Sequence, residues 1–109
     1  MNERYGSHGS LRAKAGRGGD LEALLLEAAQ ALENNEDCLL YMVARSTEDK
    51  DLILVTEAWT SREAHGASLQ DEAVKSLIQR GMPLIEQMST LSEFVPAGRW
   101  PEGKPATAV

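Results

Sequence analysis

The chain has 109 residues, which is enough material for one domain, and apolar side chains make up 42% of them. Seventeen acidic side chains against eleven basic ones give a net charge of −6, which argues against a surface for nucleic acid or anionic membranes. Cys38 is the only cysteine, and His8 and His65 are the only histidines. These counts exclude a structural disulfide and a Cys/His zinc cluster.

The distribution of apolar residues predicts a cytoplasmic protein. The N-terminal residues contain no apolar run of signal-peptide length, and no stretch is long enough to span a membrane. We expect a single domain over residues 1–97. Residues 98–109 are rich in proline, glycine and alanine, which is typical of a tail or of an arm that reaches a partner subunit.

A strand and a helix are expected first. Residues 5–14 are half polar and end before a glycine-rich turn, which favours a short strand. The helix opens at Asp20, where an acidic first turn suits the helix dipole, and it ends at Asn34. Its apolar residues recur with the 3.6-residue period of one helix face: Leu21, Leu24, Leu25, Ala28 and Leu32.

Two apolar strands follow. Residues 38–45 and 52–59 flank a polar turn and predict an antiparallel hairpin. Both segments are apolar at nearly every position, which is typical of strands that are covered on both faces. Helices can cover one face of such a sheet, but a chain this short has little left to cover the other.

A second helical region and a last strand complete the order. Thr60 and Glu63 have the spacing of a capping box, with Thr60 as the N-cap residue. Gly66 is expected to loosen this helix, and a second helical piece is predicted over residues 71–81. Residues 91–95 predict the final strand.

The resulting order, β-α-β-β-α-β, is that of the ferredoxin-like α+β fold, a four-stranded antiparallel sheet with both helices on one face. The sheet face without helices can be covered by a second copy of the chain, sheet against sheet. This explains why both hairpin strands are apolar on both faces. We therefore predict a homodimer, alone or within a higher oligomer.

The stretch from residue 55 to residue 69 contains the candidate site. Glu57 and Trp59 share one strand face, because alternate residues of a strand point the same way. His65 and Ser68 are three residues apart and share one face of the following helix. A carboxylate, an indole, an imidazole and a hydroxyl are therefore expected in the cleft between sheet and helix. Such a cleft suits a flat hydrophobic ligand.

Each candidate also has a structural interpretation. Trp59 can be part of the core, and Glu57 can pair with Arg45 across the hairpin. His65 is suited to proton transfer near neutral pH, although a single helical histidine is more often a surface or core residue. Ser68 has no neighbouring pattern that would orient a base, so a Ser-His-acid triad is not expected.

Two further residues are candidates for the same cleft. Tyr41 can present its phenol to the cleft or only pack against it. His8 lies among small residues on the first predicted strand and is a candidate pocket residue. Cys38 is interpreted as an ordinary buried thiol.

The sequence resembles the antibiotic biosynthesis monooxygenase (ABM) domain family, which includes quinol monooxygenases. The resemblance extends from about Tyr5 to Val95. Its most specific part is the run E-x-W-x5-H, formed by Glu57, Trp59 and His65 at the predicted strand–helix junction. The other segments that carry the resemblance are residues 16–21, 38–41 and 77–85.

This resemblance implies a dimeric α+β barrel with a pocket between sheet and helices in each subunit. Monooxygenases of the family use no metal, haem or flavin, because a base removes a proton from an electron-rich phenol, hydroquinone or anthrone and the resulting anion reduces O2 directly. By resemblance, His65 is the base or hydrogen-bond donor, and Trp59 orients the aromatic substrate. Tyr41, Glu57 and Ser68 are supporting polar groups.

One departure from the family bears on its chemistry. Other members place a histidine near position 68, and haem-degrading relatives place their iron-binding histidine near position 68 or 69. Here these positions hold Ser68 and Leu69, which counts against haem degradation.

Three hypotheses about function follow. The first is a cofactor-independent monooxygenase that acts on quinol-like or anthrone-like aromatic compounds. The second is an isomerase of a small carbonyl compound, in which His65 and Glu57 move the proton. The third is a non-catalytic dimer that binds a small hydrophobic metabolite.

Overall fold

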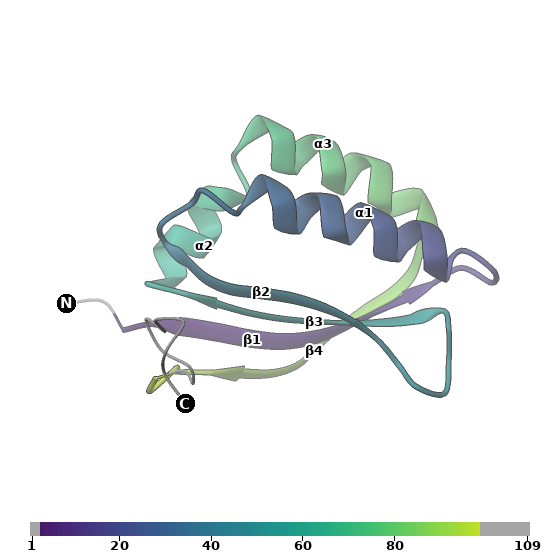
Figure 1. Ribbon diagram of the computed structural model, residues 1–109, viewed down its shortest axis with the longest axis horizontal. Helices are drawn as coiled ribbons and strands as arrows, with labels where there is room; N and C mark the ends of the chain where they lie inside the picture. Colours follow the sequence, from purple (N-terminus) through teal and green to yellow (C-terminus); the bar gives the residue numbers. More distant parts are fainter. Residues whose placement is uncertain (1–2, 99–109) are drawn as a thin grey trace, which may run out of the picture.

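The computed structural model describes residues 3–98 (Figure 1). The predicted tail lies outside these residues from position 99 onward. The elements in chain order are β1 (Tyr5–Ala13), α1 (Gly18–Ala31), β2 (Cys38–Arg45), β3 (Leu52–Trp59), α2 (Arg62–Ser68), α3 (Glu72–Gly81), a short 3-10 helix η1 (Met82–Leu84) and β4 (Ile85–Phe94).

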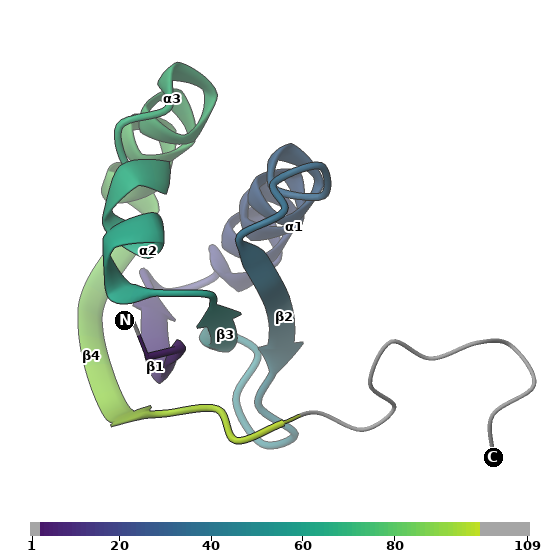
Figure 2. The ribbon, with the colours of Figure 1, turned by 90° about the vertical axis from the view of Figure 1, so that its left-hand side faces the viewer.

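The four strands form one antiparallel sheet in the order β2-β3-β1-β4. All the described helices lie on one face of this sheet, with α1 and α3 side by side above it (Figures 1 and 2). The α+β ferredoxin-like fold predicted from the sequence is therefore confirmed. None of the described helices is long and apolar enough to cross a membrane.

The hydrophobic core lies between the sheet and the helices. One buried cluster contains Leu21 of α1 and Ile53 of β3, and a second contains Leu32, Trp59 and Val74. The core residues of α1 are those that the helical period placed on one face. This packing sets the spacing between the sheet and the helices α1 and α3. The candidate site lies between these two layers.

The second helical region differs in detail from the prediction. The chain leaves the helical path between α2 and α3, so Gly66 lies inside α2 rather than at the break. Ser61 is the N-cap residue of α2, because its hydroxyl accepts a hydrogen bond from the N–H of Ala64 at 3.0 Å. The predicted capping box was therefore wrong by one residue. The Thr60 hydroxyl donates instead to Asp37 at 2.8 Å.

The last strand is longer than predicted. It begins at Ile85, six residues before the start expected from the sequence, and pairs with β1 along most of its length. Residues 85–90 contain mainly polar side chains, and most residues of β4 are exposed. The apolar pattern that marks a buried strand is therefore absent from this segment.

The start of α1 is fixed by a residue from another part of the chain. The Asp51 carboxylate, between β2 and β3, accepts hydrogen bonds from the N–H groups of Gly16 at 2.9 Å and Gly18 at 2.8 Å. Helix α1 therefore begins at Gly18, two residues before the predicted start. A side chain at Gly18 would collide with the Lys50 carbonyl oxygen, so this close approach requires glycine.

Candidate functional site

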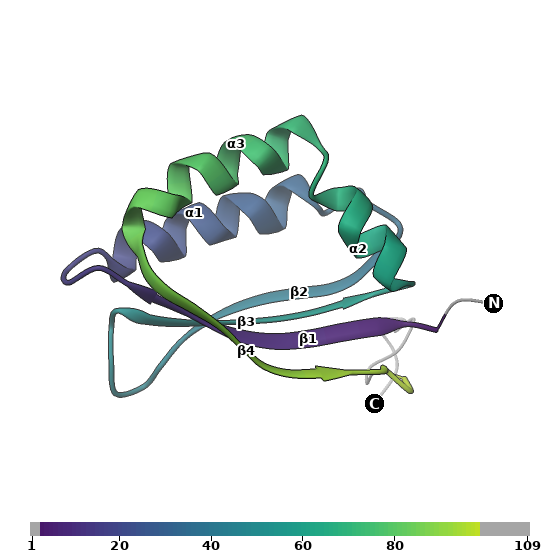
Figure 3. The same ribbon diagram turned by 180° about the vertical axis from the view of Figure 1, so that it is seen from behind.

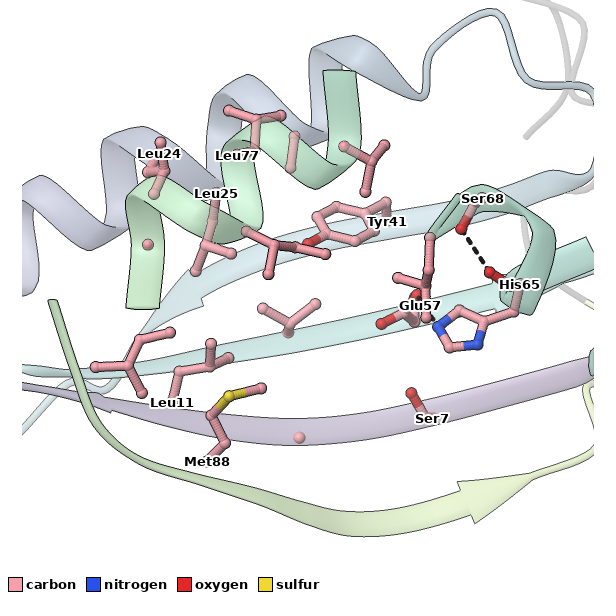
Figure 4. Close-up of a pocket in the computed structure, with 18 of the residues that line it drawn as sticks. Ser7, Leu11, Leu24, Leu25, Tyr41, Glu57, His65, Ser68, Leu77 and Met88 are labelled. Carbon is pink, nitrogen blue, oxygen red and sulfur yellow. Dashed lines mark hydrogen bonds and ion pairs between the residues drawn. The ribbon is translucent and has the colours of Figure 1, made fainter. Parts of the chain in front are cut away.

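A cavity of about 440 Å³ lies between the sheet and the helices (Figure 4). Its walls come from all four strands and from α1, α2 and α3, and most of the side chains that line it are apolar. Three of its polar side chains, those of Glu57, His65 and Ser68, lie together at the end beside α2 (Figure 4). A cavity of this kind, apolar with a few grouped polar atoms, is typical of a small-molecule site.

Glu57 is the centre of the polar end. Its Oε1 accepts a hydrogen bond from the indole Nε1–H of Trp59 at 2.8 Å, and Nε2 of His65 lies 3.5 Å from the same oxygen. The strand period places Glu57 and Trp59 on the face that looks toward the helices. The cap at Ser61 then starts α2 so that its first turn carries His65 back over them. The E-x-W-x5-H spacing thus brings these three side chains together.

The imidazole of His65 is held between two aromatic rings. Its centroid lies 5.6 Å from that of Trp59, in an edge-on arrangement, and 5.4 Å from that of Tyr5. Trp59 is only 1% exposed, whereas the side chain of His65 is 25% exposed. His65 therefore has a fixed place on the cavity wall and remains accessible to a ligand and to solvent.

Tyr5 was missed by the sequence analysis, and it anchors the outer side of His65. Its hydroxyl donates to Oε2 of Glu93 at 2.7 Å, and the guanidinium of Arg62 lies 4.3 Å from its ring centre. This hydrogen bond raises the pKa of Tyr5 and lowers the pKa of Glu93. Tyr5 lies opposite Trp59 on the neighbouring strand, and this register is not visible in the sequence. Nothing in the sequence links it to Glu93, 88 positions away.

Tyr41 directs its ring into the cavity from β2, where it pairs with Glu57 across the hairpin (Figure 4). Burial raises the pKa of its phenol, and the negative charge of Glu57 raises it further. The phenol therefore stays neutral and keeps its proton. No residue within 3–98 forms a hydrogen bond with this hydroxyl, so it can donate to an oxygen of a ligand.

Ser68 lines the cavity but already has a partner. Its hydroxyl donates to the carbonyl oxygen of His65 at 2.6 Å, one turn earlier in the chain (Figure 4). This bond holds the last turn of α2 in place and uses the hydroxyl proton. Ser68 can therefore only accept a hydrogen bond from a ligand in this arrangement.

The structure does not bring His8 to the cavity. Its Nδ1 lies 2.8 Å from the Thr56 hydroxyl, on the sheet face opposite the helices. The side chains of a strand alternate between faces, and the cavity is lined instead by its neighbours Ser7 and Gly9. The alternative pairing of Glu57 with Arg45 was also wrong, because Arg45 pairs with Glu22 of α1 at 2.8 Å.

These groups define what the site can do chemically. An imidazole next to a carboxylate can accept a proton, because the carboxylate stabilises the imidazolium that forms. The neutral phenol of Tyr41 can hold an oxygen of the ligand. Residues 3–98 contain no group of three or more His, Cys, Asp or Glu side chains placed to hold a metal ion.

Comparisons with known proteins identify the family. The sequence profile of the antibiotic biosynthesis monooxygenase family matches residues 4–80. This match covers more than half of the chain, and the chain therefore belongs to the ABM family. Family and fold together support a monooxygenase-type function. No curated protein matches the chain.

Solved structures agree with this assignment. A candidate antibiotic biosynthesis monooxygenase from Chloroflexus aurantiacus is 39% identical, with a TM-score of 0.77 over 88% of this chain and 95% of that one. One from Deinococcus radiodurans is 29% identical, with a TM-score of 0.73 over 87% and 93%. One from Caulobacter crescentus shares the fold at 17% identity, with a TM-score of 0.79 over 88% and 92%.

Proposed function

We propose that the protein is a cofactor-independent monooxygenase that oxidises quinol-like or anthrone-like aromatic compounds with O2. The observation that carries the proposal is the placement of His65 against Glu57 at the polar end of an apolar cavity. An electron-rich aromatic ring can enter the cavity with its hydroxyl group toward this pair.

His65 removes a proton from the bound substrate, and Glu57 stabilises the positive charge that the imidazole acquires. Tyr41 donates a hydrogen bond to a substrate oxygen and stabilises the negative charge that develops there. Trp59 forms part of the cavity wall and orients the substrate through ring atoms, because its N–H is already donated to Glu57. The substrate anion is thereby formed beside both the imidazole of His65 and the phenol of Tyr41.

The substrate anion then reduces O2, and the reaction balances without another reductant. For an anthrone, the reacting CH2 group loses both hydrogens and becomes a carbonyl, which removes four electrons from carbon. One oxygen atom of O2 becomes the carbonyl oxygen, and the other leaves as water with the two hydrogens. The chain needs to supply only proton transfer and orientation of the substrate.

The proposal includes a homodimer. Leu40 and Met42 of β2 are exposed on the sheet face that no described helix covers. A second copy packed on this face would bury both side chains and would stabilise the sheet over which the cavity is built. Sedimentation analysis at micromolar concentration tests this part of the proposal, and a monomer would contradict it.

The catalytic part is tested by O2 uptake with a panel of hydroquinones and anthrones. Replacing His65 by Gln should reduce turnover at least about a hundredfold, the contribution typical of a general base. His8→Gln is the matched control, because it changes the other histidine, which lies outside the cavity. Absence of turnover across the panel, or turnover unchanged in His65→Gln, would overturn the proposal.

O2 uptake, combined with deuterium exchange, also separates the alternative functions. The pair formed by His65 and Glu57 could also move a proton within a small carbonyl compound, as an isomerase requires. Incorporation of solvent deuterium into a keto substrate without O2 consumption would indicate that reaction. Ligand binding without either reaction would indicate a binding protein.

A further inference from the structure

The two ends of the cavity differ in chemistry. His65 and Glu57 lie at the α2 end, Tyr41 lies between Glu57 and Leu25, and the opposite end is lined by Leu11 and Met88 (Figure 4). Seen from behind, η1 leads the chain from α3 into β4 at the end of the fold that lies away from α2 (Figure 3). The cavity therefore has a polar end beside α2 and an apolar end away from it.

The apolar end is open to solvent. Ile78 of α3, Met82 of η1 and Met88 of β4 all line the cavity, yet they are 45%, 54% and 60% exposed. Large apolar side chains that are exposed together commonly mark a binding surface. Methionine is unbranched and flexible, so it can adapt to a chain that passes between such residues.

The size of the cavity also favours a ligand that is larger than a single ring. Its volume of about 440 Å³ lies within the range of about 300–1,000 Å³ that is typical of sites for drug-sized ligands. A single hydroxylated ring at the polar end would leave the walls formed by Leu11, Leu24 and Leu25 without contacts. A ligand that also carries an apolar extension would fill this part.

We propose that the cavity binds an amphipathic aromatic compound whose hydroxylated ring lies at His65 and Tyr41 and whose linear alkyl or isoprenoid chain leaves between Met82 and Met88. The placement of the ring rests on the proposed function. The chain runs past Leu11 and Leu25 and covers Ile78 at the exit. Specificity for such a substrate then depends on the apolar end and not on the catalytic pair.

Binding of 4-n-alkylphenols with two to eight carbons in the chain tests this proposal by calorimetry, without turnover. The dissociation constant should fall about fourfold for each added CH2 group that is buried, and then level off once the chain reaches solvent. The double variant Met82→Glu/Met88→Glu should lose this gain for the long chains. Its affinity for 4-ethylphenol should stay the same.

Leu26→Glu is the matched control, because Leu26 is also exposed but belongs to the outer side of α1 and does not line the cavity. Its chain-length dependence should equal that of the wild type. A flat series in the wild type, or a series that the double variant leaves unchanged, would overturn the inference. Binding as expected without O2 uptake on any alkylated hydroquinone would instead contradict the proposed function alone.

Discussion

Trp59 donates its indole N–H to the carboxylate of Glu57, two residues earlier on the same face of β3, at 2.8 Å. The indole is almost completely buried, so the hydrogen bond holds Glu57 in one position beneath α2. The same carboxylate oxygen lies 3.5 Å from His65. Trp59 therefore acts on His65 through Glu57, in addition to any contact with a ligand.

Two substitutions separate the effect of the indole hydrogen bond on stability from the effect of the Glu57 charge on catalysis. Trp59→Phe keeps an aromatic ring but removes the donor, and it should cost about 2 kcal/mol of unfolding free energy because Glu57 loses a charged hydrogen bond. Glu57→Gln keeps an acceptor for the indole but removes the charge, so its stability should change little. We expect kcat of Glu57→Gln to fall roughly tenfold, since the imidazolium is no longer stabilised.

Urea denaturation and O2 uptake measure both effects. A Glu57→Gln variant that is as active as the wild type would contradict the assignment of Glu57 to the proton-transfer step. A Trp59→Phe variant that is as stable as the wild type would show that the indole hydrogen bond does not hold the carboxylate.

The N-cap of α2 also controls the position of His65. Ser61→Ala should destabilise the protein by about 1 kcal/mol, because the N–H of Ala64 loses its partner. Ser61→Asp should preserve stability, since aspartate is an equally good cap. Thr60→Ala is the control and should cost less than about 0.5 kcal/mol, because the hydroxyl of Thr60 makes only an exposed hydrogen bond. Thermal denaturation that ranks Thr60→Ala below Ser61→Ala in stability would contradict this assignment.

Most of the fold could be predicted, because the apolar pattern of a helix or strand depends only on residues that are close in the sequence. The hairpin strands begin and end at the predicted residues, Cys38–Arg45 and Leu52–Trp59, because both segments are apolar at nearly every position, although β2 lies at an edge of the sheet. The first half of β4 was missed because its residues are mainly polar and largely exposed, so no apolar pattern marks this part of the strand. The cap of α2 was misplaced because Thr60 and Ser61 are both good capping residues, and only the contact of Thr60 with Asp37 decides between them.

The site, like the fold, could be predicted only where its contacts join residues that are close in the sequence. The convergence of Glu57, Trp59 and His65 follows from spacing within one strand and the next helix. The position of His8 depends on which face of β1 looks toward the helices, and a strand of small polar residues does not show this. The contact between Tyr5 and Glu93 joins the two ends of the described chain, so no local pattern could indicate it.

Two neighbouring glycines at the start of α1 provide a matched test of the Asp51 contact. Gly18→Ala should lower the free energy of unfolding by about 1–3 kcal/mol, because the new methyl group collides with the backbone of residue 50. Gly19→Ala should raise it by about 0.5–1 kcal/mol, since its methyl group meets open space and alanine favours a helix. Urea denaturation measures both. Equal effects of the two substitutions would contradict the tight packing of Gly18 against the loop.

The hydrogen bond between Tyr5 and Glu93 predicts a pH dependence of stability. It lowers the pKa of Glu93 in the folded protein below the value in the unfolded chain. A carboxyl group of this kind stabilises the folded state above its unfolded pKa, and the stabilisation is lost as pH falls through the folded pKa. Tyr5→Phe keeps the ring beside His65 but removes the donor, so the variant should have a lower Tm than the wild type at pH 7.

The difference in Tm should shrink as the pH is lowered through the range in which glutamate titrates, because Glu93 then becomes protonated in both proteins. Thermal denaturation of wild type and Tyr5→Phe in steps from neutral to acidic pH measures this trend. Glu93→Gln should show the same convergence with the wild type, since it removes the same charge. A Tm difference that stays constant over the whole range would mean that Glu93 is not the acceptor that stabilises Tyr5, and that ring packing alone holds Tyr5 against His65.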